Sequence, residues 1–206
     1  MVNLFDIRYL RVGTPDLDAA IEFATRIVGL QLIAREGRRA YFRSDRVATR
    51  GDTRDYTLMY FEGDANDHVS AFDILDRDSL DAAAAEIEKA GHRVHWGTPA
   101  ECDERRVRNF IGFQDPTGNK HEIVVRPYHS GVRYFPSRDA GITHFSHIGL
   151  RTAHASRDEA FWTRLMNARV SDWIGDAPLL RIHTIHHSLA LFPSPRPGIQ
   201  HINHQV

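Results

Sequence analysis

The stretch FDIRYLRVGTPDLDAAIEFATRIVGL, residues 5–30, predicts a strand followed by a helix. Thr14 or Asp16 is placed to cap the helix N-terminus, and Gly29 stands where glycine commonly ends a helix. Three short β-like runs follow, QLIARE, RAYFRS and YTLMYFEG, with a Gly- and charge-rich loop over residues 44–55. This order predicts a β-α-β-β-β module of roughly 60 residues.

The same order then starts again. HVSAFDIL predicts a strand, SLDAAAAEIEKAGH a helix that Gly91 ends, and KHEIVVRP a closing strand. A turn-rich stretch, PYHSGVRYFPSRDAG, is typical of a linker. After it come the predicted strand FSHIGLRT, the helix SRDEAFWTRLMN with Ser156 as its cap, the β-like runs RVSDWIG, LLRIHTI and HHSLALF, and the strand GIQHINHQV.

The spacing of one position in each first strand supports an internal repeat. Tyr9 and His68 are 59 residues apart, and His147 and His204 are 57 apart. Between the halves, Tyr9 to His147 is 138 residues and His68 to His204 is 136. Matching intervals of this kind indicate a duplicated module.

The predicted fold class is therefore α+β, built from tandem pairs of βαβββ modules, with the fourth module cut off after its first strand. We expect a metal-free N-terminal domain over residues 1–128, a linker over 129–141, and an incomplete C-terminal catalytic domain over 142–206. Because a stop inside a strand leaves a sheet edge unpaired, we expect the natural polypeptide to continue past Val206.

Composition excludes several classes of partner. The 206 residues carry a formal charge of -1, which gives no basic field for nucleic acid or a membrane surface. The N-terminus lacks a secretory signal, and no segment has the roughly 20 apolar residues of a membrane span. With Cys102 as its single cysteine, the chain is expected in a reducing cytoplasm.

Histidine is unusually frequent in the last third of the chain, which holds eight of the 13: His144, His147, His154, His183, His186, His187, His201 and His204. If strands alternate regularly, His147 and His204 face the same cup of the sheet and His201 faces away. Two imidazoles and one carboxylate on adjoining strands form a facial triad that suits non-haem Fe(II). By the interval from His68 to Glu122, the carboxylate of a fourth module falls beyond Val206.

The first half is expected to lack a metal, because Tyr9 replaces a ligand and Glu122 is expected to pair with a nearby Arg or Lys. In the second half, the run HTIHHSLALF places His183, Ile185 and His187 on one face if it is a strand. A histidine among apolar neighbours has a lowered pKa and can act as an acid–base group near neutral pH. His187 is the candidate for that role, and a packed core histidine is the alternative.

These residues resemble the type I extradiol ring-cleavage dioxygenases of the vicinal oxygen chelate superfamily, whose two domains are pairs of βαβββ modules. SHIGL is similar to the strand with the first iron ligand, which points to His147. IHHSLALFP is similar to the segment with the catalytic acid–base histidine, which points to His187 with His186 beside it. GIQHINH is similar to the strand with the second iron ligand, assigned to His204 rather than His201.

The resemblance implies ring opening of a catechol-type diol by O₂ at a non-haem Fe(II), with Mn(II) as a second option and a Glu beyond Val206 as third ligand. It also implies a small-molecule catechol partner and a homo-oligomer, and a 206-residue form that is inactive alone. Two alternatives stay open: a metal-free protein of the same superfamily that sequesters small molecules, and a glyoxalase-like metalloenzyme.

Overall fold

The structure is a computed structural model that describes residues 1–44, 54–132, 134–137 and 141–206. Of the loop predicted over 44–55, residues 45–53 lie outside the described part, as do 133 and 138–140 of the predicted linker. None of the helices in the described ranges is both long and apolar enough to cross a membrane.

The first half forms one eight-stranded sheet in the order β2-β3-β4-β1-β5-β8-β7-β6. Its strands are β1 (Ile7–Thr14), β2 (Gln31–Glu36), β3 (Arg39–Arg43), β4 (Leu58–Glu62), β5 (His68–Asp73), β6 (His95–Trp96), β7 (Val107–Gln114) and β8 (Lys120–Pro127). Its helices are α1 (Leu17–Glu22), which continues as the π-helical η1 (Phe23–Val28), α2 (Arg77–Lys89) and α3 (Pro99–Arg105).

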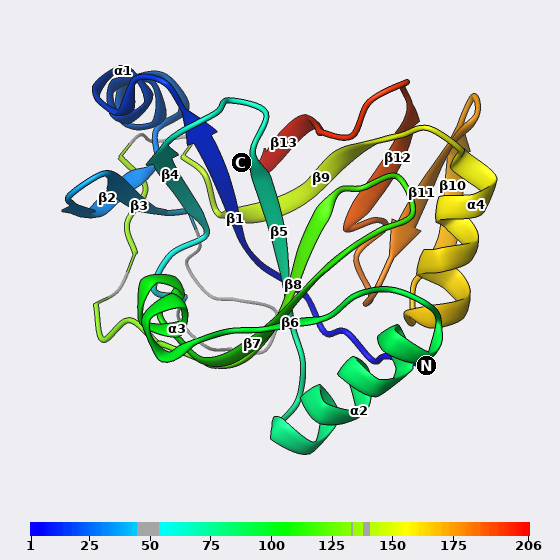
Figure 1. The fold of residues 1–206 in the computed structure, drawn as a ribbon. Coiled ribbons are helices and arrows are strands. Elements are labelled where there is room, and N and C mark those ends of the chain that lie inside the picture. The colour runs from blue at the N-terminus through cyan, green and yellow to red at the C-terminus, as the bar shows by residue number, and fades with distance from the viewer. Residues whose placement is uncertain (45–53, 133, 138–140) are drawn as a thin grey trace.

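The second half forms a five-stranded sheet in the order β10-β11-β12-β9-β13 (Figure 1). Its strands are β9 (His144–Thr152), β10 (Arg169–Ile174), β11 (Ala177–Arg181), β12 (Leu189–Pro193) and β13 (Ile199–Gln205). A helical segment, α4 (Ala155–Ala160) followed by the π-helical η2 (Phe161–Leu165), lies beside them.

The two sheets share one plan, which confirms the predicted α+β fold of repeated βαβββ modules. In the first, β1 and β5 are antiparallel neighbours, and β4 lies parallel to β1. In the second, β9 and β13 are antiparallel neighbours, and β12 lies parallel to β9. The order β10-β11-β12-β9-β13 thus repeats β2-β3-β4-β1-β5, and β13 matches the first strand of a fourth module.

Local signals account for the helix ends. The Asp16 carboxylate accepts a hydrogen bond from the amide of Ala19 at 2.9 Å, and Gly29 ends η1 with a φ of 93°. Inspection of the sequence missed α3, although its start is a capping box in which Thr98 and Glu101 bond to each other's backbone. The cap expected at Ser156 is wrong by two residues, since His154 stands at that position.

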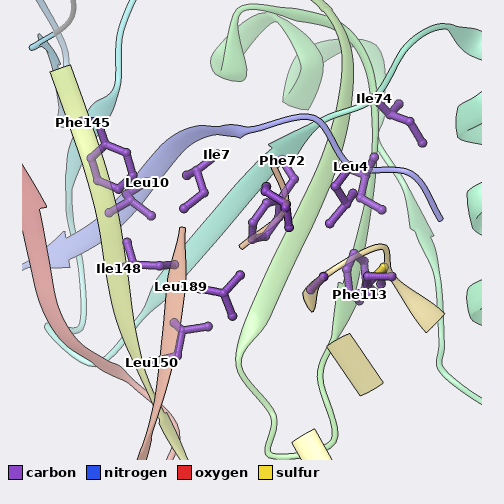
Figure 2. Close-up of a cluster of buried hydrophobic side chains, with 14 of the residues drawn as sticks. Leu4, Ile7, Leu10, Phe72, Ile74, Phe113, Phe145, Ile148, Leu150 and Leu189 are labelled. Atoms are coloured by element: carbon purple, nitrogen blue, oxygen red, sulfur yellow. The ribbon is translucent and has the colours of Figure 1, made fainter. Parts of the chain in front are cut away.

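The hydrophobic core is continuous between the halves. Figure 2 shows Leu10 of β1 beside Ile148 of β9 and Leu189 of β12 in one cluster. Trp162 of η2, fully buried, packs on Phe72 of β5 with ring centroids 5.3 Å apart. The second half is therefore anchored on the first, while the predicted domain limits 1–128, 129–141 and 142–206 stay a prediction.

Candidate metal centre

His147 of β9 and His201 of β13 meet on the face of the second sheet that points away from the shared core. We call this face, and the equivalent face of the first sheet, the cup. Their Nε2 atoms are 3.1 Å apart. Two imidazole nitrogens that each lie about 2.1 Å from one metal ion, at right angles, are about 3 Å apart. The pair therefore has the spacing of two neighbouring ligands of one ion.

Each of these histidines follows an extra residue that interrupts the strand pairing. Register shifts leave Ser146 extra on β9 and Gln200 extra on β13. The Ser146 hydroxyl lies 3.2 Å from Nδ1 of His147, and the Gln200 amide oxygen accepts a hydrogen bond from Nδ1 of His201. Because Nδ1 of His201 carries the proton, its Nε2 keeps a free lone pair for a metal.

Gly149 makes room for the His201 ring. The two residues are directly opposite each other across β9 and β13. A Cβ atom at Gly149 would come within 2.6 Å of the Nδ1 and Cε1 atoms of His201. Real Cβ contacts are not this short, so any larger residue would push the imidazole away.

His187 joins the pair from a neighbouring loop. Its ring centroid is 4.1 Å from that of His147. The predicted strand over HTIHHSLALF is wrong in its first part, because residues 182–188 form a bent loop and β12 starts only at Leu189. His186, exposed to solvent, places its Nδ1 3.0 Å from Nδ1 of His187.

Burial holds this histidine cluster in its neutral form. The pKa of His147 is lowered from 6.5 to about 4, first by burial and then by the charges of His187 and His201. Burial also lowers the pKa of His201, and it lowers that of His187 together with the charges of His186 and His201. At neutral pH these imidazoles offer lone pairs, which is the form that binds a metal or accepts a proton.

His204 lies on the opposite face of β13, so the predicted orientation of His201 and His204 is wrong. The register shift at Ser146 pairs His204 with Phe145, and these rings are 5.8 Å apart. Phe145 belongs to the shared core with Ile148 (Figure 2). The structure thus brings His147, His187 and His201 together and places His204 on the core side of the strand.

Strand pairing also changes the equivalences between the halves. Leu10 pairs with Leu58 and Ser70, as Ile148 pairs with Leu189 and Ile202. Counted from these pairs, the first-half residues on the cup face are Tyr9 in place of His147, Arg11 in place of Gly149, and Val69 in place of His201. His68 faces the other way.

The first-half cup keeps a carboxylate, as predicted, and pairs it with an arginine. Arg105 Nε donates to Glu122 at 2.7 Å, and the Tyr9 hydroxyl donates to the same carboxylate at 2.6 Å. A salt bridge from Arg11 adds to them at 3.5 Å. Burial, followed by the Glu122 charge, raises the pKa of Tyr9 well above its usual value, so this hydroxyl stays protonated.

Within the described ranges, no group of three or more His, Cys, Asp or Glu side chains is arranged to hold a metal ion. The second-half cup holds the imidazoles of His147 and His201 and the nearby His187. The expected third ligand, a Glu beyond Val206, is not tested by these residues.

A family profile described as the Glyoxalase/Bleomycin resistance protein/Dioxygenase superfamily matches residues 6–123, more than half of the chain. Among solved structures, a halotolerant catechol dioxygenase superposes with a TM-score of 0.84 at 25% identity, covering 98% of this chain and 70% of the other. The Mn(II)-bound glyoxalase from Novosphingobium aromaticivorans gives 0.80 at 25% identity, covering 98% and 65%.

Three curated relatives that the chain matches are all named as dioxygenases. The chain is 27% identical to a 1,2-dihydroxynaphthalene dioxygenase of Sphingobium xenophagum over 83% of its own length, and spans 58% of that relative. It is 25% identical to an iron-dependent extradiol dioxygenase of Rhodococcus jostii (strain RHA1), over all of its length and 73% of the relative. A biphenyl-2,3-diol 1,2-dioxygenase of Pseudomonas sp. (strain KKS102) is 29% identical, with 91% and 68% covered.

Proposed function

We propose, from the premise that this chain belongs to the Glyoxalase/Bleomycin resistance protein/Dioxygenase superfamily, that its second half forms the iron site of an extradiol dioxygenase. The reaction is the opening of a catechol-type diol by O₂ beside its hydroxyl groups. The observation that carries the proposal is the 3.1 Å approach of the His147 and His201 Nε2 atoms, with the centroid of the tilted His187 ring 4.1 Å from that of His147. Names of the relatives, which include iron-dependent and diol-cleaving dioxygenases, support it.

The second-half cup can supply two of the three protein ligands that a non-haem ferrous ion needs. His147 and His201 are the ligands that we assign, in place of the predicted pair His147 and His204. Two neutral imidazoles and one carboxylate on one face of Fe(II) leave the other positions open. Fe(II) is the proposed metal, Mn(II) its alternative, and the carboxylate beyond Val206 stays a prediction.

When bound, the iron would lower the pKa of the diol hydroxyls and connect the diol electronically with O₂. His187 is the proposed acid–base group, because its imidazole is kept neutral by burial and lies against a ligand. Its lone pair accepts a proton from a diol hydroxyl and can return it later in the reaction. His186, within 3.0 Å of His187, holds the orientation of that ring from the solvent side.

The test is O₂ uptake by the polypeptide that the complete reading frame encodes, loaded with Fe(II) without oxygen and then given substituted catechols. We expect a yellow ring-opened product. His187→Ala should keep its iron and lose about 100-fold or more in rate, the range for an acid–base group. Iron binding without any O₂ uptake by the parent protein would contradict the proposal.

The same experiment separates the two alternatives. A metal-free sequestering protein would bind aromatic ligands equally well with and without a chelator. A glyoxalase-like enzyme would use Mn(II) without consuming O₂, and its candidate neighbour is the Mn(II)-bound glyoxalase named above. The catechol substrate and the homo-oligomeric state are part of the proposal, and sedimentation of the purified protein measures the latter.

A further inference from the structure

The loop that carries His187 is tied together by another histidine. His183 stands at its start, and the Nδ1 atom of its ring accepts a hydrogen bond from the amide of Ile185 at 3.2 Å. The other ring nitrogen, Nε2, lies 3.2 Å from the hydroxyl of Ser188 at the loop's end. One imidazole therefore joins both sides of the bend that presents His186 and His187.

The same ring reaches across to the first half of the molecule. His183 Nε2 lies 3.1 Å from a carboxylate oxygen of Asp6, the residue before β1. Since Nδ1 accepts a hydrogen bond from the Ile185 amide, Nε2 must carry the ring proton and donate it to Asp6. Both side chains are nearly buried, at 11% exposed for His183 and 13% for Asp6, so water competes little for the bond.

Asp6 is itself fixed by the first half. Its second carboxylate oxygen accepts from Arg54 at 2.5 Å, and its first accepts from the amide of Ile7 at 2.8 Å. Arg54 also donates to the carbonyl of Ile7 at 2.6 Å and is buried. The carboxylate is thus held on the first sheet before it receives the His183 hydrogen bond.

We infer that Asp6 and His183 are positioning residues that form a clasp, through which the first half sets the place of His187 beside His147. This inference rests on the proposed function for its importance to catalysis, since it assigns the acid–base role to His187. The clasp gives the first half a defined role, because it fixes the loop between β11 and β12, whose residues 182–187 lie outside both strands.

The direct test is the nuclear Overhauser effect between the ring protons of His147 and His187 in the metal-free protein, since the rings are 4.1 Å apart. We expect His183→Phe, which keeps an aromatic ring but removes both nitrogens, to abolish this signal. Amide exchange at Ile185 should also rise by about 10-fold or more, as expected for a lost hydrogen bond. The signal between His147 and His201 should be unchanged. Thr184→Ala, an exposed change in the same loop, is the matched control and should alter neither signal.

A second variant keeps the test decisive if the first folds poorly. Asp6→Ala combined with Arg54→Met removes both partners of the buried ion pair, so that neither charge is left alone. It should also abolish the His147–His187 signal. Persistence of that signal and of slow Ile185 exchange in either folded variant would overturn the clasp, whatever the activity of the protein.

Enzyme activity tests whether the clasp matters for catalysis. In an active parent, His183→Phe should lower kcat by about 10-fold or more while the iron content and KM stay within about twofold, because positioning acts through the acid–base group. An unchanged kcat in a variant that has lost the signal would overturn the positioning role. An inactive parent would count against the proposed function alone, because the nuclear Overhauser and exchange results decide the clasp separately.

Discussion

The two cups of this molecule have the same strand plan and opposite ways of handling charge. In the first, Tyr9 and Arg105 surround the carboxylate of Glu122, and Val69 stands where the second cup has His201. In the second, the Nε2 atoms of two neutral imidazoles, His147 and His201, lie 3.1 Å apart. A buried carboxylate needs a cation or hydrogen-bond donors, and in the first cup a guanidinium supplies what a metal would supply in the second.

The comparison shows that a repeat can keep its fold while a few positions change which charged and polar groups line its cup. Arg11 in the first cup reaches Glu122, whereas its counterpart Gly149 leaves the space that the His201 ring fills. The Arg11 side chain that fills the first cup has no counterpart in the second, where Gly149 has no side chain. Function is therefore determined by residues on the strands rather than by the topology.

The most drastic way to break the comparison is to give the first cup the ligands of the second. Tyr9→His, Val69→His and Arg105→Ala, combined in a protein with His147→Ala and His201→Ala, would place two imidazoles beside Glu122. Because a facial triad is then complete, we expect Co(II) affinity to rise by at least about 100-fold over the His147→Ala/His201→Ala parent. Adding Glu122→Gln is the control and should reverse the gain. Equal affinity with and without the new histidines would contradict the equivalence of the cups.

Removing the guanidinium alone should instead destabilise the protein. Arg105→Met leaves the Glu122 carboxylate, 4% exposed, without its main cation, and the free energy of unfolding should fall by about 3–5 kcal/mol. Chemical denaturation measures it. Arg105→Met combined with Glu122→Gln should recover most of the loss. A single variant that loses less than about 1 kcal/mol, the value of a surface ion pair, would show that Arg105 does not balance this charge.

Filling the space at Gly149 should weaken metal binding in the second cup. Gly149→Ala puts a methyl group within 2.6 Å of the His201 ring, so we expect Co(II) binding to weaken by about 10-fold, the lower range for a disturbed ligand. Isothermal titration calorimetry measures the affinity. As a control, Gly131→Ala adds a methyl group where nothing lies within 4 Å. Parent-like affinity in Gly149→Ala would mean that the ring has another place to go.

The smallest expected effect is a pH dependence of stability. The pKa of His147 is lowered from 6.5 to about 4 in the folded protein. Between these values the unfolded chain binds a proton that the folded chain does not, so the free energy of unfolding falls as pH drops from 6.5 to about 4. His147→Gln should make this decline shallower in denaturation experiments on the metal-free protein. Identical slopes for the two proteins would show that His147 is not held neutral.

Much of the fold was predictable from the sequence because strand alternation, Asp16 and Gly29 are local signals. His147 and His187 were singled out by the repeat spacing and the family resemblance, and the structure brings their rings within 4.1 Å of each other. The pairing of Glu122 with an arginine or a lysine was expected and is confirmed by Arg105.

The prediction that His204 faces the cup was wrong for a physical reason. The assignment of His204 came from the matching module intervals and the family resemblance, whereas the extra residues Ser146 and Gln200 change which side chains face the cup. Bulges depend on pairing between strands far apart in the chain, so spacing within one strand does not reveal them. Gly149, at the position opposite His201, was the one trace of this arrangement in the sequence.

The measurement that tests the central claim most directly is the Co(II) affinity of three single variants of the metal-free protein: His147→Ala, His201→Ala and His204→Ala. Removing a ligand weakens metal binding more than disturbing its surroundings does. We therefore expect the Co(II) affinity of the first two variants to fall by about 100-fold or more. His204→Ala, on the opposite face of β13, should stay within about twofold of the parent, since it makes no contact with the metal. Loss of binding in His204→Ala with retention in His201→Ala would contradict the account and restore the assignment made from the sequence.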